Sequence, residues 1–524
     1  MKATARPWVL LGLCAALFLP ALATLPMTDY KELRVVLPAR EMAAGGDWLM
    51  PRFQGELRLR KPPLMYWIVA SAFGLARSTD SATVARLPSA LMGTAAILAL
   101  YAGGAGLIGR RRALLGACVA ATSFLVLRHA RVAQADMALC LFTLLAVLCG
   151  YGALSSGGGG IRRWLGFGVC AGLGFMTKGP AALALPVAAL AAFAAVDRGG
   201  RRRLFGLGAL LSLLVFAAIV VPWYLLVLHP TAAQSAAQTA IHNELRETFE
   251  GTDHAQPFFF YLHQLPAGML PWGLLLPFAV ASVWRARHHR GARFLLCWFA
   301  TSFVILSLVR NKQLHYALLL VPPAALITGD LLAHGWLAAR SWRRALCRGY
   351  LAGLLALVLL AGVACLLAPF LGRGWPVAPL VAAGVALAAP AGMGLAWPGL
   401  RAFPARFAAA LLAMVAAVYA NAYAFTPLYD ARSLLPVFAG AARPATSPAP
   451  RVFAVGSNLT ALQFYLDRPL APATNFASAW AQCGARDAVL LVSDRKHPLE
   501  APADPPPALE MRQRDLRCLL YLKR

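Results

Sequence analysis

Charged residues are scarce in this sequence of 524 amino acids, and acidic residues are the scarcest, with 21 Asp and Glu against 49 Lys and Arg. Only 13% of the chain is charged, whereas an ordinary soluble domain carries about a quarter. A soluble nucleic-acid-binding protein with a net charge of +28 would place its bases on polar faces, and a disordered chain would be poor in hydrophobic residues. Because 60% of the residues are hydrophobic, both classes are excluded, and a polytopic membrane protein remains.

Long apolar runs fill most of the chain. A membrane-spanning helix needs about 20 mostly apolar residues. On this criterion we predict thirteen spans, which lie near residues 8–26, 84–108, 112–127, 136–155, 164–177, 179–196, 204–227, 264–284, 293–309, 314–334, 349–371, 376–398 and 405–426.

The first apolar run has two interpretations. It follows the basic residues Lys2 and Arg6, as a first span does, but a cleaved signal peptide ending at Ala21-Leu22-Ala23 is the alternative. The positive lead stays in the cytoplasm in both cases. Residues 27–82 therefore lie outside the cytoplasm on either interpretation.

The positions of the bases indicate the orientation. Alternation of sides from a cytoplasmic N-terminus gives inner loops of which nearly every one is a basic cluster, namely 110–112, 162–163, 197–203, 285–293, 340–348 and 401–406. Of the acidic residues, only Asp197 and Asp330 fall near that side. Cytoplasmic loops are enriched in Lys and Arg, so we predict a cytoplasmic N-terminus and an outer C-terminus.

Three long segments lie on the outer side: 27–82, 228–264 and 427–524. The last has short apolar runs between Pro-rich spacers, which predict strands at 451–456, 488–493 and 517–522 and a helix at 461–467. We therefore expect a small α/β domain at the C-terminus. Its two cysteines, Cys483 and Cys518, form a disulfide if the compartment is oxidising, and otherwise stay free.

Charged residues of the first outer loop are candidates for a site, because charge at the membrane is expensive and often functional. Glu32, Arg34 and Lys61 stand among apolar residues at helical spacing. The alternative is a loop on lipid head groups with solvated charges. Asp136 begins a span and Lys178 sits in a Gly-Pro turn between two spans, where a helix cap and a snorkelling lysine are the respective alternatives.

Two further outer stretches complete the candidate set. His254 precedes an aromatic run, and Lys312 and Tyr316 lie in the short turn before the tenth span. The positive-inside rule explains lysines in cytoplasmic loops, but it does not explain lysines on the outer side. Opposite the carboxylates of Glu32 and Asp136, they suit a membrane-anchored anion such as a lipid phosphate.

Taken in order, these stretches resemble the bacterial branch of the polyprenyl-phosphate-sugar-dependent glycosyltransferases of the GT-C fold. The nearest types are the lipid A aminoarabinose transferases, with the protein O-mannosyltransferases more distant. The matching stretches are Arg40-Glu41-Met42 with Gly46-Asp47-Trp48, Gly55 to Trp67, Arg131 to Met137, Gly174 to Pro180, Pro257 to Trp272, and Lys312 to Pro322.

The resemblance implies an all-α polytopic membrane protein in the bacterial inner membrane, with about thirteen spans and a periplasmic active site and C-terminal domain. It implies transfer of a sugar from an undecaprenyl-phosphate donor to an acceptor such as lipid A, lipopolysaccharide or a protein. The resemblance leaves open whether a divalent metal serves as cofactor. A flippase for lipid-linked sugars is the rival from another class, but it predicts polar residues at mid-membrane depth, and the span centres here are almost free of charge.

The chain departs from the family pattern at three places. The family has an Asp-Glu pair where counting back from Arg40 gives Lys31 and Glu32, so Glu32 inherits the carboxylate role, and Asp29 replaces it only if the loop shifts. Arg60 stands where the aminoarabinose type has a glutamate, which puts a metal site in doubt, and Asn243 stands where relatives often have a His. These departures argue against naming aminoarabinose as the sugar.

The expected chemistry assigns roles to the candidates. A phosphate leaving group needs stabilisation of developing negative charge, which we assign to Arg34, Lys61, Lys178 and Lys312. A hydroxyl acceptor benefits from a base, for which Glu32 and Asp136 are the candidates. Tyr316 and His254 are candidates for hydrogen bonds to the sugar or phosphate.

Overall fold

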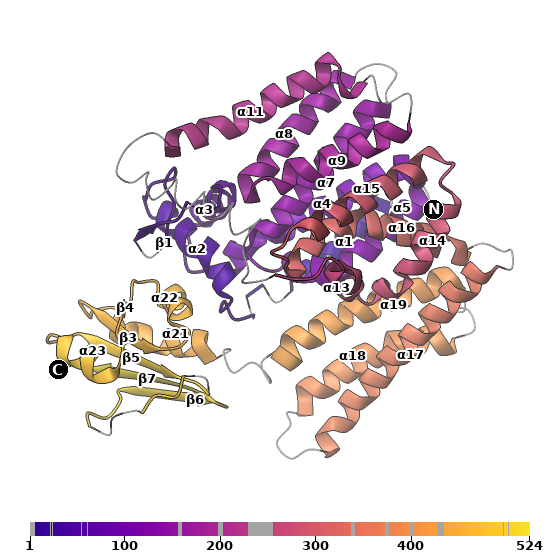
Figure 1. The fold of residues 1–524 in the computed structure, drawn as a ribbon. Helices are drawn as coiled ribbons and strands as arrows, with labels where there is room; N and C mark the ends of the chain where they lie inside the picture. Colours follow the sequence, from indigo (N-terminus) through magenta and orange to yellow (C-terminus); the bar gives the residue numbers. More distant parts are fainter. Residues whose placement is uncertain are drawn as a thin grey trace.

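The structure is a computed structural model. It describes every residue except 1–5, 21, 24, 54, 60, 156–159, 198–202, 229–254, 337–340, 372–376, 398–401, 427–433, 496, 501, 503 and 524. Two units are visible in Figure 1: a large helical bundle and a small sheet near the C-terminus, drawn in yellow.

Helices occupy all thirteen predicted segments. They are α1 (Arg6–Phe18), α4 (Ala82–Ile108), α5 (Arg110–Ala121), α7 (Ala135–Ser155), α8 (Gly160–Lys178), α9 (Ala181–Val196), α11 (Leu207–Leu228), α14 (Leu276–Arg285), α15 (Arg290–Leu308), α16 (Val321–Ala333), α17 (Trp342–Leu371), α18 (Val377–Ala396) and α19 (Phe403–Tyr419). Shorter pieces adjoin several of them, namely α6 (Phe124–His129), α13 (Phe260–Gly268), the 3₁₀-helices η1 (Trp272–Leu275), η2 (Leu314–Leu320) and η3 (His334–Trp336), and the π-helix η5 (Ala420–Phe425).

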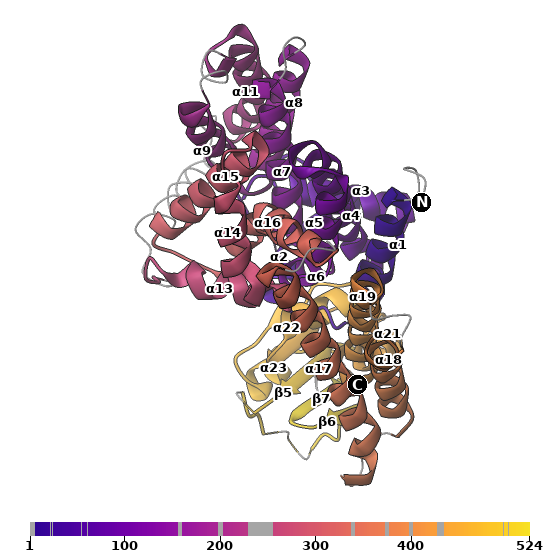
Figure 2. The same cartoon turned by 90° about the vertical axis from the view of Figure 1, so that its right-hand side faces the viewer.

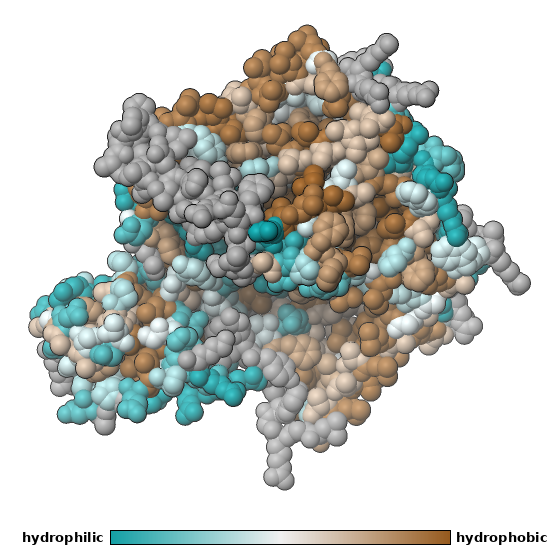
Figure 3. Space-filling model, in the orientation of Figure 1, coloured by the Kyte–Doolittle hydropathy of each residue, from teal (hydrophilic) through white to brown (hydrophobic). Residues whose placement is uncertain are grey.

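Eight helices in the described part of the chain are long and apolar enough to cross a membrane. Four more apolar helices have 10–17 residues, among them α9 (Ala181–Val196). The multi-pass helical architecture is thus confirmed, while the number thirteen stays a prediction. Apolar side chains cover much of the bundle surface, in contrast to the more polar sheet unit (Figure 3), as expected where a surface faces lipid.

The loop of residues 27–82, predicted to lie on the outer side, is folded rather than merely solvated. It contains α2 (Tyr30–Ala43), the two-stranded sheet β1 (Arg52–Phe53) and β2 (Glu56–Leu57), and α3 (Leu64–Ala76). Asp29 caps α2, because its carboxylate accepts a hydrogen bond from the Lys31 amide at 2.9 Å. Leu33 and Val36 of α2 are buried in a core that also includes residues of α3 and of the C-terminal unit.

The C-terminal unit is a five-stranded sheet with the order β4-β3-β5-β7-β6. Its elements are α21 (Leu434–Thr446), β3 (Val452–Gly456), α22 (Leu459–Leu466), β4 (Ala471–Pro472), α23 (Phe476–Gln482), β5 (Ala488–Ser493), β6 (Leu509–Gln513) and β7 (Leu516–Leu522). β3 is parallel to β4 and β5, and β7 is antiparallel to β5 and β6. Strands β3, β5 and β7 lie where the sequence predicts strands, because their apolar runs are buried between helices on both faces.

The two cysteines of this unit are free. Cys518 belongs to the core under α21 and α22, and Cys483 to the separate core under α23 on the other face of the sheet. The sheet therefore separates the two thiols, and of the two alternatives the structure shows the free cysteines. Burial raises the pKa of Cys518 to about 12, which makes its thiol unreactive.

The sheet unit lies beside the first loop (Figures 1 and 2), and polar contacts join the two. Arg40 of α2 donates hydrogen bonds to the carbonyls of Gln463 and Phe464 at 3.3 and 2.8 Å, and its guanidinium lies 3.1 Å from Asp467. The Met27 amide donates to the Tyr465 hydroxyl at 2.6 Å. The helix α2 is thus held between the bundle and the sheet unit.

Candidate functional site

The start of α7 places a carboxylate below the surface of one end of the bundle. Asp136 lies in the first turn of α7 and is 7% exposed. A carboxylate is favoured there by the partial positive charge of the helix N-terminus. Its Oδ1 accepts a hydrogen bond from the Lys178 ammonium at 2.5 Å, which further favours the ionised carboxylate.

Lys178 reaches Asp136 because α8 ends at this residue. The next residue, Gly179, has a φ of +90°, which is open to glycine and strained for other residues. Pro180 then starts α9. The Lys-Gly-Pro turn therefore holds the lysine at the end of α8, and the ion pair, rather than a snorkelling side chain, is what the structure shows.

Aromatic and imidazole rings surround this ion pair. His315 Nε2 lies 3.8 Å from Asp136 Oδ1, and the Lys178 ammonium lies 5.1 Å from the centre of the Tyr316 ring. The His129 ring lies 6.2 Å from the His315 ring. The end of α6, the start of α7, the end of α8 and the start of η2 thus meet at one place.

A second lysine approaches from the first loop. Lys31, in the first turn of α2, donates a hydrogen bond to Gln313 Oε1 at 2.6 Å. Desolvation and the neighbouring charge of Lys178 lower the pKa of Lys31, against the opposite effect of Asp29 and Asp136. We name Asp136, Lys178, Lys31, His315 and Tyr316 the Asp136 cluster.

Glu32 is not part of this cluster. It is 1% exposed, and it accepts two hydrogen bonds from the Arg86 guanidinium, at 2.7 and 2.8 Å, and a third from the Ala133 amide at 2.8 Å. Arg86 also donates to the carbonyls of Leu22 and Leu25. The carboxylate therefore ties α2 to α4 and to the loop before α7, and Arg86 also binds the segment that follows α1.

Asp29 is more accessible than Glu32, with 37% of its side chain exposed. Its Oδ2 accepts a hydrogen bond from Gln134 at 3.2 Å and lies 4.0 Å from Arg128. Its charge also acts on Lys31. Asp29 thus stands beside the Asp136 cluster without any shift of the loop.

The other residues predicted to bind the donor are not shown to join the Asp136 cluster. The Lys312 ammonium donates to the Gln256 carbonyl at 2.9 Å, where Ala255 pairs with Asn311 in an isolated β-bridge. Arg34 lies 4.9 Å from the centre of the Tyr30 ring, and Lys61 is half-buried between β2 and α3. His254 lies outside the described residues.

Three residues of these sites were not predicted from the sequence. Lys31 and His315 belong to the Asp136 cluster, and Arg86 binds Glu32. Lys31 and His315 adjoin predicted residues, so their positions were a usable signal. Arg86 lies in a run predicted as an ordinary span start, and nothing in its neighbours indicates that it binds Glu32, 54 residues away.

Metal ligands do not gather in the described part of the chain: no three His, Cys, Asp or Glu side chains there are arranged to hold an ion. Arg60 and His254 are not among the described residues.

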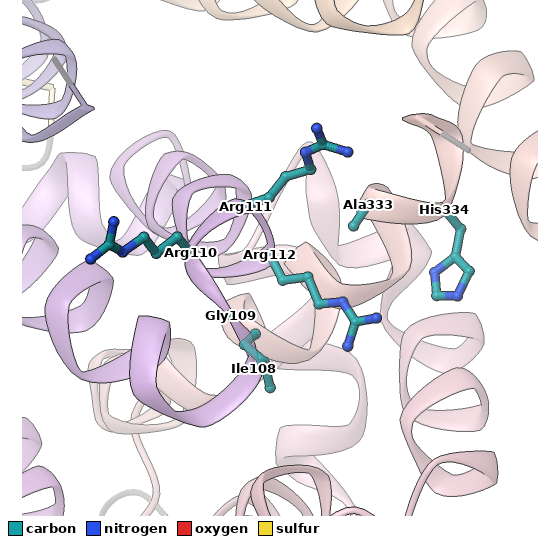
Figure 4. Close-up of a pocket in the computed structure, with 7 residues that line it drawn as sticks. All are labelled: Ile108, Gly109, Arg110, Arg111, Arg112, Ala333 and His334. Atoms are coloured by element: carbon teal, nitrogen blue, oxygen red, sulfur yellow. The ribbon is translucent and has the colours of Figure 1, made fainter. Parts of the chain in front are cut away.

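The opposite end of the bundle carries a basic cavity. Helix α4 starts near Glu32 and its 27 residues extend about 40 Å to Ile108. Beside Ile108 is a cavity of about 310 Å³ lined by Arg110, Arg111 and Arg112 of α5 and by His334. Arg110 points away from the other two arginines (Figure 4), and Arg112 lies 3.1 Å from Asp330. This end matches the predicted cytoplasmic side and contains no predicted site residue.

Several known proteins are similar to this chain in sequence or in fold. Residues 60–225 match the family model described as dolichyl-phosphate-mannose-protein mannosyltransferase. An undecaprenyl phosphate-α-4-amino-4-deoxy-L-arabinose arabinosyl transferase of Pseudomonas paraeruginosa is 31% identical over 62% of this chain and 60% of its own length. One from Pseudomonas fluorescens is 31% identical over 68% of this chain and 65% of its own length. The chain thus matches these relatives over somewhat less than two thirds of their length.

Solved structures show the same fold. ArnT from Cupriavidus metallidurans, solved with undecaprenyl phosphate, matches 99% of this chain and 98% of its own with a TM-score of 0.72 at 19% identity. An oligosaccharyltransferase from Archaeoglobus fulgidus matches 94% of this chain and 69% of its own, with a TM-score of 0.52 at 12% identity. The chain is therefore similar in sequence to these arabinosyl transferases, and it shares the fold of ArnT.

Proposed function

We propose that this protein is an integral membrane glycosyltransferase that moves a sugar from an undecaprenyl-phosphate donor to an acceptor lipid such as lipid A. The observation that carries the proposal is the Asp136 cluster, in which two ammonium groups flank a buried carboxylate at the end of a membrane bundle. The relatives named as transferases of an undecaprenyl-phosphate-linked sugar support the same reaction class.

The cationic groups of the cluster are proposed to bind the donor phosphate. When the bond between the anomeric carbon and the phosphate oxygen breaks, the phosphate gains negative charge. Ammonium groups already fixed around that position stabilise the charge without reorganising. Lys178 and Lys31 are the nearest such groups, and we propose that Arg34, Lys61 and Lys312 extend the positive field along the first loop and the 310–316 turn.

Asp136 is proposed to act on the acceptor. A hydroxyl acceptor attacks the anomeric carbon through oxygen and loses its proton, which the Asp136 carboxylate accepts while the Lys178 ammonium stabilises the leaving phosphate. A phosphate acceptor already carries the charge, so Asp136 would only orient it. Glu32 is proposed to position the loop before α7, because its oxygens are engaged by Arg86 and Ala133. Asp29, with 37% of its side chain exposed, is proposed as the first-loop carboxylate that contacts an acceptor hydroxyl.

The topology is proposed from the charges. We infer thirteen spans, a cytoplasmic N-terminus next to the Arg110–Arg112 end of the bundle, and a periplasmic Asp136 cluster. Residues 27–82 and 228–264 would be periplasmic loops, and 427–524 a periplasmic α/β domain in the inner membrane of a bacterium. The contacts of Arg40 with Gln463 and Phe464 support placing the first loop and this domain on one side.

The test is an in vitro transfer reaction. Purified full-length protein is incubated with an undecaprenyl-phosphate-linked sugar and with lipid A, and the lipids are analysed by mass spectrometry. We expect a lipid A species heavier by one sugar residue. Transfer to protein alone would support the protein O-glycosyltransferase alternative, and movement of intact donor across liposomes without any product would support a flippase.

The KM for the donor should depend on pH through the protonation of Lys31. Because its pKa is lowered, Lys31 loses its proton at a lower pH than an ordinary lysine as pH rises. The KM for the donor should therefore rise in the alkaline range. Lys31→Arg keeps its charge and should move this rise to higher pH, whereas Lys31→Met should show a raised donor KM at every pH. Coincident donor KM profiles for the parent and Lys31→Arg would contradict the assignment.

A further inference from the structure

Arg131 is a buried cation for which the described part of the chain supplies no anion. The residue is 7% exposed, and its Nε and Nη2 atoms are fully buried without a hydrogen-bond partner. Within the described residues, no carboxylate forms an ion pair with it either. A buried charge without a partner is unfavourable by several kcal/mol, and proteins rarely keep one.

The nearby Arg86 is a buried arginine whose guanidinium has hydrogen-bond partners, in contrast to the Nε and Nη2 atoms of Arg131. It is 1% exposed and binds both oxygens of Glu32 and the carbonyls of Leu22 and Leu25. Arg86 is also one of the charges that act on Arg131. Two arginines therefore lie close together, but one carboxylate serves only the first of them.

The loop that carries Arg131 is held by packing and by a hydrogen bond on either side of the residue. The preceding residue, Ala130, packs against Gly93 of α4, where an added Cβ would come within 2.9 Å of the Ala130 side chain. Two residues after Arg131, the Ala133 amide is bound to Glu32 at 2.8 Å. The backbone is thus held in place on both sides of Arg131.

The surroundings of Arg131 favour an incoming anion. Burial and the Arg86 charge lower the pKa of Arg131, and the Tyr423 hydroxyl of η5 is the other group that acts on it. A guanidinium offers parallel N–H groups that match the oxygens of a phosphate or carboxylate. The missing partner is therefore an acidic group with at least two oxygens.

We propose that Arg131 binds a phosphate group of the acceptor lipid, as a second anion subsite distinct from the donor phosphate site. This rests on the proposed function. The donor phosphate belongs at the Asp136 cluster, where Lys178 and Lys31 lie. Arg131 precedes Asp136 by five residues, but its electrostatic neighbours are Arg86 and Tyr423 rather than that cluster. A lipid with a phosphate beside its acceptor group would occupy both places.

The first test is a thermal unfolding experiment on full-length protein in detergent. In the absence of lipid, Arg131→Met should unfold at the same temperature as the parent or higher, because it removes an unpaired buried charge. Phosphorylated lipid A should raise the unfolding temperature of the parent but not of the variant, and lipid A stripped of phosphate should raise neither. A lower unfolding temperature for lipid-free Arg131→Met would show a structural role and overturn the proposal.

Two further unfolding measurements, with inorganic phosphate and with undecaprenyl phosphate, distinguish which phosphate compound binds at Arg131. Inorganic phosphate alone should have little effect on the parent, and stabilisation equal to that by phosphorylated lipid A would overturn the assignment to a lipid. Undecaprenyl phosphate should stabilise the parent and Arg131→Met alike. A loss of stabilisation by undecaprenyl phosphate in the variant would instead place the donor at Arg131.

The second test is kinetic. Hydrogen bonds between charged groups contribute roughly 1.5–3 kcal/mol, so Arg131→Met should raise the KM for phosphorylated acceptor by about 10- to 100-fold. The KM for the donor should not change, and Arg131→Lys should recover part of the loss. Arg52→Gln removes an exposed charge from the same side and is the matched control. If the parent protein transfers no sugar, the proposed function fails, and the unfolding experiment still decides whether Arg131 binds lipid phosphate.

Discussion

Asp136→Asn should reduce kcat for sugar transfer by about 10² to 10⁴ if the acceptor is a hydroxyl, the usual contribution of a positioned proton acceptor. The amide cannot take the acceptor proton, and it leaves the Lys178 ammonium without the counter-ion now at 2.5 Å. The measurement is the rate of product formation at saturating donor and acceptor. A KM change for the donor is expected to be smaller than the change in kcat, because Lys178 still faces the phosphate.

The matched control is Asp330→Asn. Asp330 is also a buried carboxylate paired with a cation, Arg112 at 3.1 Å, but it lies at the opposite end of the bundle. The control should leave kcat unchanged. If Asp136→Asn, shown to be folded, transfers sugar at the parent's rate, Asp136 has no part in the reaction and the cluster is only structural.

Arg86→Met should be the most destabilising of these substitutions, lowering the free energy of unfolding by about 3–5 kcal/mol. The substitution leaves the Glu32 carboxylate buried without its cation, and it removes the donors to the Leu22 and Leu25 carbonyls. The measurement is the unfolding temperature and the yield of folded protein in detergent. Arg517→Met removes half of an exposed pair with Glu510 and should change stability by no more than about 1 kcal/mol.

A double variant distinguishes the cause. In Glu32→Gln with Arg86→Met the uncompensated charge is gone, so part of the lost stability should return. Equal stability of the double variant and Arg86→Met would show that the lost carbonyl contacts, rather than the stranded carboxylate, account for the effect. Glu32→Gln alone is expected to act mainly on stability, and its rate loss would therefore not report on the type of acceptor.

The helical architecture was predictable because a membrane imposes a simple condition on the sequence. Each of the thirteen apolar runs is helical, since about 20 apolar residues have no other way to satisfy their backbone in lipid. Strands β3, β5 and β7 were predictable for a similar reason, as short apolar runs between turn residues.

The pairing of charges was less predictable. Asp136 and Lys178 were both identified, but the sequence contains no sign that they touch across 42 residues. Glu32 was identified as a reactive carboxylate, yet its neighbours in sequence do not include Arg86, which neutralises it. Lys31 appeared only as a departure from the family pattern. Tertiary packing decides which cation meets which carboxylate, and local patterns do not report it.

The attachment of α2 to the C-terminal unit has a consequence for how the protein is made. The hydrogen bond from Arg40 to Phe464 joins residues 424 positions apart. At roughly 5–20 residues per second, a ribosome needs about 20 to 85 s to produce the second partner after the first. During that interval α2 is already outside the cytoplasm, if the proposed topology holds, while the surface that covers it does not yet exist. The growing chain must therefore protect the apolar side of α2 on lipid or on a chaperone until its own last hundred residues arrive.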